Sequence, residues 1–221
     1  MPMYEQIAAE LQATQTALVA VSKTKPEERI LEMYQKGQRD FGENKVQELL
    51  SKYEALPKDI RWHFIGHLQR NKVKYIAPFI HLIHGIDSFR LLKEIDKQAR
   101  NNERTIQGLL QFHIAEESSK FGLDIEEAKA ILCNPEFQTF SNIQISGLMG
   151  MATYTDDTQQ VQKEFRNLKH IFDQLKKEFF EQNEAFKEIS MGMSGDYQLA
   201  IKEGSTMVRI GTKLFGNRQY P

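Results

Sequence analysis

Eight short apolar runs, each followed by a segment with helical spacing, constrain the fold of this chain more than any other feature. This alternation is typical of parallel strands that are joined by crossover helices. The strands are predicted at residues 17–23, 40–42, 62–66, 82–86, 108–114, 145–151, 188–193 and 207–211.

Helical spacing between these runs is clearest in the segment that follows the sixth predicted strand. One apolar stripe there steps by three and four residues through Val161, Phe165, Leu168, Phe172, Leu175 and Phe179. Such a stripe predicts a helix that packs on a core, in preference to one that binds a partner helix or a membrane. Further helices are predicted at residues 45–53, 89–99 and 125–132, with an additional one at 4–11 before the first strand.

The chain has no composition break, no Gly-Ser or Pro-rich linker and no low-complexity stretch along its 221 residues. A second domain would need such a seam. We therefore expect one domain over residues 1–221, an α/β fold of the (β/α)8 TIM-barrel class, for which this length is short but permitted. An open, doubly wound sheet is the alternative.

The charge balance argues against a polyanion or membrane partner. Lys and Arg number 29 and Asp and Glu number 30, so the net charge of −1 creates no field that would gather nucleic acid. The amphipathic N-terminus lacks the apolar core of a signal peptide, and the single Cys133 cannot form an internal disulfide. We expect a cytoplasmic protein in which Cys133 is a buried structural residue.

In a barrel of this class, function is expected at the C-terminal ends of the strands, where the loops surround the open mouth. The first predicted strand ends in Lys23, an unusual terminus for an apolar run. Lys23 is either a rim residue or a nucleophile. Desolvation and the like charge of Lys25 would both lower the pKa of Lys23 and leave a free amine to attack an aldehyde.

The ends of the last two strands carry residues that suit a phosphate group. Loops after the seventh and eighth strands of barrels commonly bind phosphate through backbone N–H groups and hydroxyls. Ser194 with Gly195, and Gly211 with Thr212, fit that description. Either pair alone would be weak evidence, but their joint occurrence predicts a phosphate site at this corner.

Several strings in the sequence also carry a family resemblance. They are AVSKTKP (20–26), FGENKVQE (41–48), WHFIGHLQRNK (62–72), SSKFG (118–122), GLMGMA (147–152), SMGMSGDYQLAI (190–201) and GSTMVRIGTKLFG (204–216). In this order they resemble the pyridoxal phosphate homeostasis protein family. The resemblance implies a barrel of the alanine racemase N-terminal type that holds pyridoxal 5'-phosphate (PLP) as a lysine aldimine and takes part in vitamin B6 homeostasis.

Carried over residue by residue, the resemblance gives each site residue a role. Lys23 matches the lysine that forms the aldimine, Arg209 the arginine that faces the pyridine nitrogen, and Asn44 a residue lining the pocket. The phosphate cup matches Ser194, Gly211 and Thr212. An arginine stays protonated at neutral pH and donates to the ring nitrogen, so the ring remains uncharged and is a poor electron sink.

A comparison with alanine racemases argues against catalytic turnover. Where their GLMTHFA segment places a histidine against the ring, this chain has Met151, which packs but cannot shuttle protons. The chain ends ten residues after Gly211, so we expect no second domain to deliver the opposing base of racemisation. The prediction is a PLP carrier without turnover that hands cofactor to apoenzymes. A PLP-dependent racemase or lyase and a Schiff-base aldolase acting on a phosphosugar are the alternatives.

Other candidate groups give weaker signals. His63 and His67 are four apart on a predicted strand, and His81 and His84, three apart, would point to opposite faces, so no metal site is expected. Lys25 and Lys120 lie in strings shared with the family and are either transient PLP ligands or surface lysines. Because the barrel accounts for every apolar stripe, a monomer is expected.

Overall fold

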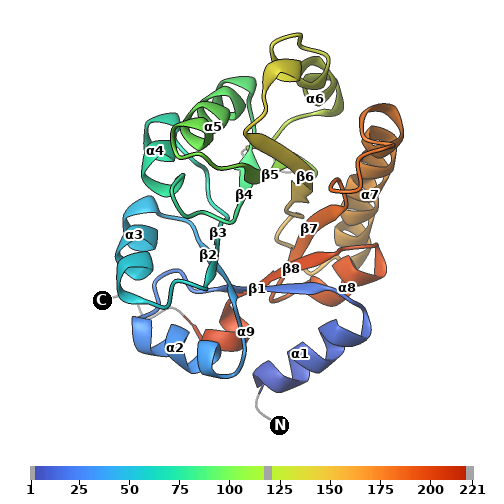
Figure 1. The fold of residues 1–221 in the computed structure, drawn as a ribbon. Helices are drawn as coiled ribbons and strands as arrows, with labels where there is room; N and C mark the ends of the chain where they lie inside the picture. The colour runs from blue at the N-terminus through green and yellow to red at the C-terminus, as the bar shows by residue number, and fades with distance from the viewer. Residues whose placement is uncertain (1–2, 117–120, 218–221) are drawn as a thin grey trace.

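The computed structural model describes residues 3–116 and 121–217 and shows eight parallel strands that close into a barrel. Each strand pairs with its neighbours in chain order, and β1 also pairs with β8, with Ala17 opposite Met207 and Ala20 opposite Ile210. Figure 1 shows the helices arranged outside the ring of strands. The predicted (β/α)8 barrel is confirmed, and the open sheet is excluded because β1 and β8 share hydrogen bonds.

All eight predicted strands are present, and two of them, β4 and β7, have the predicted bounds. The strands are β1 Ala17–Val21, β2 Asp40–Glu43, β3 Arg61–Phe64, β4 Leu82–Ile86, β5 Ile106–Phe112, β6 Ile143–Gly150, β7 Glu188–Met193 and β8 Met207–Ile210. Several strands end one or two residues earlier than predicted. The residues beyond those ends lie in the loops at the barrel mouth, where Ile114 is buried but Ile65 and Met151 are only partly buried.

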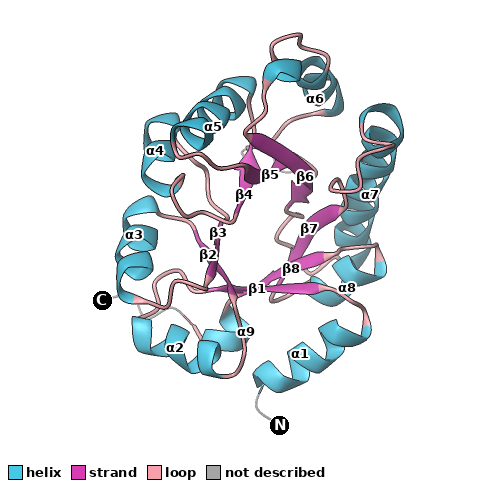
Figure 2. Cartoon of the chain, viewed as in Figure 1, coloured by secondary structure: helices cyan, strands magenta, loops and turns pink. Residues whose placement is uncertain are grey.

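The helices cover the outer face of the strands, as the colouring by secondary structure in Figure 2 makes plain. They are α1 Met3–Ala13, α2 Glu27–Gln35, α3 Val46–Ala55, α4 Val73–Ile76, α5 Phe89–Asn101, α6 Ile125–Leu132, α7 Thr158–Phe179, α8 Tyr197–Lys202 and α9 Thr212–Phe215, with short 3-10 turns at Arg70–Lys72 and Phe137–Thr139. None of these described helices is long and apolar enough to cross a membrane.

Helix α7 packs on the barrel as its sequence predicts. Val161, Phe165, Leu168 and Leu175 are buried, and Phe172 is partly buried and stacks on Phe186 with ring centroids 4.9 Å apart. Asp157 caps the helix because its carboxylate accepts the N–H groups of the first turn. Cys133 differs from expectation: it follows the last turn of α6 and is exposed, since the buried face of that helix is formed by Ala128, Ile131 and Leu132.

Two apolar layers hold the barrel together. The larger lies between strands and helices, and a smaller one inside the barrel consists of Val19, Leu82, Leu109, Met149 and Met207, with Met151 packed against it. Because side chains of a strand alternate between its two faces, β1, β4, β5, β6 and β8 contribute to both layers. The interior of the barrel is therefore packed, and the remaining open space lies at the mouth.

We expect Phe165→Ala to lower the free energy of unfolding by about 3–5 kcal/mol, because it leaves a cavity between α7 and the strands where a fully buried ring now packs. Asn167→Ala, on the exposed face of the same helix, is the control and should change it by less than about 0.5 kcal/mol. Chemical denaturation of both variants measures the difference, and equal losses would contradict the packing described above.

Candidate functional site

A cavity of about 520 Å³ opens at the mouth of the barrel, over the C-terminal ends of β1, β6, β7 and β8. Six of the seven residues predicted for the site line it: Lys23, Met151, Ser194, Arg209, Gly211 and Thr212. Asn44, the seventh, is not among its lining residues. It follows β2 and lies against Gly66, where a Cβ would come within 2.6 Å of the Asn44 carbonyl oxygen, so its role stays a prediction.

Lys23 lies in a tight turn immediately after β1, rather than in the strand as predicted. The Lys25 N–H donates to the Ser22 carbonyl at 3.0 Å, which closes the turn, and Thr24 has a φ of +64°. A positive φ at the third position is the mark of a type II turn, and it is strained for a β-branched residue such as Thr24. The strain lies directly beside the lysine that the sequence singles out.

A largely buried ionic network of Lys52, Glu43 and Glu48 hydrogen bonds to the backbone of this turn. The Lys52 ammonium donates to the Ser22 carbonyl at 2.9 Å and to carboxylate oxygens of Glu43 and Glu48, each at 2.7 Å. Glu48 also accepts the Thr24 N–H, and Ser22 Oγ donates to Glu43 at 2.6 Å. Burial raises the pKa of Glu43, although Lys52 opposes the shift. The sequence does not predict this network, because nothing marks Glu43 and Lys52 as partners before the fold is known.

Lys25 is used structurally. Its ammonium donates to the carbonyls of Phe215, Gly216 and Asn217 at 3.1, 3.0 and 2.8 Å. These contacts tie the segment after α9 to the turn after β1. Of the two alternatives for Lys25, the contacts favour a structural lysine, whereas Lys120 lies outside the described residues.

The corner after β7 and β8 gathers hydrogen-bond donors. The Gly211 N–H donates to Ser194 Oγ at 3.2 Å, and the Lys213 N–H approaches the same oxygen at 3.5 Å. A Cβ on Gly211 would lie 3.2 Å from the Val21 carbonyl oxygen, whereas one on Gly195 would meet nothing within 4 Å. The corner thus combines two hydroxyls, those of Ser194 and Thr212, with backbone N–H groups at a hollow. That donor set suits a phosphate.

Arg209 is buried in the barrel wall and lines the inner side of the cavity. Its Nη1 donates to the Ser190 carbonyl at 2.8 Å and to Ser190 Oγ at 2.6 Å, and its Nη2 donates to the Gly150 carbonyl at 3.1 Å. Burial lowers the pKa of Arg209 to about 10, although the charge of Asp196 opposes the shift. The guanidinium therefore remains a pure donor at neutral pH.

Behind Arg209, polar groups continue through the interior of the barrel. His84 Nδ1 lies 3.0 Å from Ser190 Oγ, His84 Nε2 lies 3.0 Å from His63 Nδ1, and His63 Nε2 lies 3.0 Å from Asp40 Oδ1. The sequence analysis compared His63 with His67, but His67 is exposed in the loop after β3 and His63 is buried. It missed the pairing of His63 with His84, which needs the parallel register of β3 and β4.

At the far end of this row, donor atoms of Asp40, His63 and His81 lie within 4.8 Å of one another. Such spacing is compatible with a metal ion, but Arg61 hydrogen bonds to both carboxylate oxygens of Asp40. Burial lowers the pKa of His81 to about 4, so this imidazole is neutral at pH 7. Both carboxylate oxygens of Asp40 are thus already engaged by Arg61.

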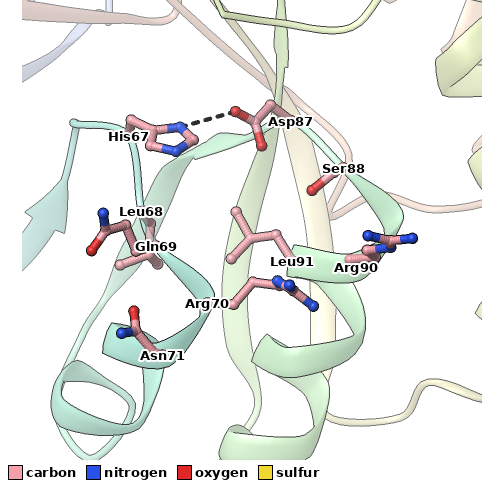
Figure 3. A pocket seen from close by; sticks show the side chains of 9 residues that line it. All are labelled: His67, Leu68, Gln69, Arg70, Asn71, Asp87, Ser88, Arg90 and Leu91. Carbon is pink, nitrogen blue, oxygen red and sulfur yellow. Dashed lines mark hydrogen bonds and ion pairs between the residues drawn. The ribbon is translucent and has the colours of Figure 1, made fainter.

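A second hollow of about 560 Å³ lies between the loop after β3 and the start of α5 (Figure 3). His67 Nδ1 and Asp87 Oδ2 are 3.1 Å apart on its rim, and the guanidinium groups of Arg70 and Arg90 border it. None of the seven predicted site residues lines it. The two hollows therefore have similar volumes and differ in chemistry. Of the two, the mouth cavity is the one that combines an amine, a buried guanidinium and the Ser194 corner.

Comparison with known proteins places the chain in a family. Residues 4–219 match the family model of the alanine racemase N-terminal domain. A pyridoxal phosphate homeostasis protein of Aquifex aeolicus is 42% identical over 205 residues, which are 92% of this chain and 87% of the relative. The chain belongs to the pyridoxal phosphate homeostasis protein family. The human protein of that name is 37% identical over 221 residues, with 96% of this chain and 80% of the relative covered.

Solved structures agree with this membership. PipY of Synechococcus elongatus, solved without PLP, superposes with a TM-score of 0.87 at 33% identity and covers 98% of this chain and 100% of PipY. The same protein solved with PLP bound gives 0.84 at 34% identity, with 97% and 100% covered. Alanine racemase of Bartonella henselae, with a TM-score of 0.74 but 18% identity and 62% of its chain covered, shares the fold.

We expect Thr24→Gly to raise the free energy of unfolding by about 0.5–1 kcal/mol. A left-handed conformation costs a residue with a Cβ roughly 1–2 kcal/mol, which exceeds the entropic cost of glycine in the unfolded chain. Thr24→Val is the control, because a second β-branched residue keeps the strain. Urea denaturation compares the variants, and a destabilised glycine variant would show that the turn is not strained.

Proposed function

We propose that this protein binds pyridoxal 5'-phosphate in the mouth cavity, holds it through Lys23 and supplies it to PLP-dependent apoenzymes. The observation that carries the proposal is the convergence of Lys23, Arg209 and the Ser194–Gly211 corner on one cavity of about 520 Å³. These groups come from three different strand ends, and each matches a different part of the cofactor. PLP bound to PipY, and the names of the relatives described above, support the same reading.

The chemistry of the cavity fits the cofactor at each end. The Ser194 and Thr212 hydroxyls offer neutral donors to a phosphate dianion, and the Gly211 N–H, which donates to Ser194 Oγ, lies beside them. On the inner side, Arg209 donates and cannot accept, so it suits an unprotonated ring nitrogen. Met151 offers an apolar, polarisable surface against which a ring would pack. Lys23, at the tip of its turn, presents the amine.

PLP supplies an aldehyde that bonds to a primary amine and a ring that withdraws electrons from that carbon. The residues that line the cavity would determine which reactions of the cofactor can proceed. Arg209 keeps the ring nitrogen unprotonated, which weakens electron withdrawal, and Met151 provides no proton acceptor. We infer that the site binds the cofactor without catalytic turnover. The relatives described above bear the name of homeostasis proteins rather than of enzymes.

The proposal also covers the location of the protein, its oligomeric state and its partners. We infer a monomer, because the apolar faces of the described helices are used against the barrel. We infer a cytoplasmic location, because a chain whose single Cys133 is a free thiol suits a reducing compartment. Apoenzymes are the inferred recipients, since the cavity opens at the mouth where a partner has access to it.

Lys23→Ala should abolish the visible absorption band of the protein loaded with PLP, because no amine then remains to bond the aldehyde. Non-covalent PLP is allowed, since Arg209 and the phosphate corner are intact. Lys74→Ala, an exposed lysine on α4, is the control and should keep the band. Absorption spectra after dialysis measure both. A Lys23 variant that keeps its band would overturn the assignment, and a wild-type protein without any band would favour the aldolase.

Pyridoxal, which lacks the phosphate, should bind at least about tenfold more weakly than PLP. Charge-assisted hydrogen bonds are worth about 1.5–3 kcal/mol each, and about 1.4 kcal/mol corresponds to a factor of ten. Gly211→Val should remove most of this preference, because a Cβ there would lie 3.2 Å from the Val21 carbonyl oxygen and a larger side chain would displace the corner. Equilibrium titration of both ligands measures the preference. Equal affinities for the wild-type protein would move the phosphate away from this corner.

The protein loaded with PLP should fail as an amino-acid racemase. A proton acceptor typically contributes about 10²- to 10⁴-fold to such a reaction, and Met151 replaces the group that would face the ring. Incubation with L-alanine and other L-amino acids, followed by chiral chromatography, should give no more D-isomer than free PLP does. Deuterium exchange on one face, with Lys23 as the base, is compatible with this expectation. Rapid formation of the D-isomer would establish the racemase alternative.

A further inference from the structure

An unbroken row of hydrogen bonds crosses the interior of the barrel from Arg209 at the mouth to Asp40 at the opposite end. Its members are Arg209, Ser190, His84, His63 and Asp40, and its four contacts measure 2.6, 3.0, 3.0 and 3.0 Å. The residues come from β8, β7, β4, β3 and β2, so no local segment of the chain could form it. All but Asp40 are buried.

The chemistry at its two ends sets the direction of the hydrogen bonds in this row when both imidazole rings are neutral. A guanidinium only donates hydrogen bonds, and an ionised carboxylate only accepts them. Burial alone would raise the pKa of Asp40, but Arg61 and His63 outweigh it and hold that pKa well below the usual range. Asp40 is therefore ionised at neutral pH and accepts from His63 Nε2. With both imidazoles neutral, every other donor in the row then points from Arg209 toward Asp40.

This direction specifies the proton on each imidazole. Ser190 accepts from Arg209 and donates to His84 Nδ1, so the proton of His84 is on Nε2. That proton is donated to His63 Nδ1, which leaves the proton of His63 on Nε2, facing Asp40. Burial holds the pKa of His84 well below its usual value, which agrees with a neutral ring. With both rings neutral, each is thus in the Nε2–H form, and every contact has one donor and one acceptor.

Other charged groups surround the row without interrupting it. Arg61 pairs with Asp40 at the far end, and Asp196 lies on the mouth side of Arg209. The neighbouring interior layer is fully apolar, as Val19, Leu109 and Met149 show. Apolar side chains would fill the same space without the desolvation that a buried polar row requires, so the row needs a reason other than packing.

We propose that Ser190, His84, His63 and Asp40 are positioning residues that hold the Arg209 guanidinium as a donor facing the cavity. Ser190 engages Nη1 twice, through its carbonyl and its hydroxyl, and Gly150 engages Nη2. The plane of the guanidinium is thereby fixed, and donors not used in these bonds remain for a ligand in the cavity. The inference rests on the proposed function for the identity of that ligand, and its proton arrangement stands without it.

The arrangement of protons is tested first on the protein without cofactor. Ring ¹⁵N chemical shifts distinguish the Nδ1–H, Nε2–H and doubly protonated forms of histidine. We expect His63 and His84 in the Nε2–H form at neutral pH. A proton on Nδ1 of either ring would overturn the direction of the row, whatever the protein binds.

The positioning role is tested with a matched set of serine variants loaded with PLP. Ser190→Ala should raise the dissociation constant about tenfold and shift the visible band, because Arg209 loses a 2.6 Å contact. Ser190→Thr keeps the hydroxyl and should restore both. Ser205→Ala removes another buried hydroxyl, bonded to the Met191 and Met207 carbonyls, and should change neither. Identical behaviour of Ser190→Ala and Ser205→Ala would overturn the proposal.

A substitution of Asp40, at the end of the row far from the cavity, tests the positioning role most directly. Asp40→Asn should alter the dissociation constant at least about twofold and shift the band, although Asp40 does not line the cavity. Asp59→Asn, which removes an exposed partner of Arg39, is the control and should have no effect. No spectral change in the folded Asp40 variant would overturn the positioning role. If the wild-type protein binds no PLP, the proposed function fails while the ¹⁵N result still decides the row.

Discussion

The parallel pairing of β1 with β8 is the interaction on which the rest of the structure depends. It closes the sheet, and closure of a parallel barrel brings the C-terminal ends of all eight strands to one mouth. Lys23 follows β1 and Arg209 lies in β8, so residues 186 positions apart become neighbours of one cavity. Without this pairing the Lys23 amine would lie at one edge of an open sheet, and the Arg209 guanidinium and the phosphate corner at the other.

Closure also creates a barrel interior that side chains must fill, and in this chain one part of it is apolar and another part is polar. One layer is apolar, while the positions between Arg209 and Asp40 carry polar groups that satisfy one another. A buried guanidinium is costly unless it is hydrogen bonded, and the row distributes that requirement across the barrel to an ion pair at its far end. Stability and site chemistry are thus served by the same contacts: the groups that satisfy Arg209 are those that orient it.

The support of Lys23 follows the same logic on the other side of the mouth. Its turn includes a strained residue, Thr24, and a buried network of Lys52 with Glu43 and Glu48 holds that turn in place. Strain of this kind persists only where surrounding contacts determine the conformation. The turn, held by these contacts, keeps Lys23 in a defined position on the wall of the mouth cavity.

The sequence by itself determined the class of fold and most of the residues that line the mouth cavity. Alternating apolar runs and helical stripes are local patterns, so they identified all eight strands and helix α7, and the residues at strand ends identified Lys23, Ser194, Arg209 and Gly211. Only the tertiary structure decided what depends on register and closure: that Asn44 lies off the cavity lining, that Lys25 binds carbonyls after α9, and that Cys133 is exposed. The row from Arg209 to Asp40 belongs to this second group, because its hydrogen bonds join five strands and exist only when the barrel is closed.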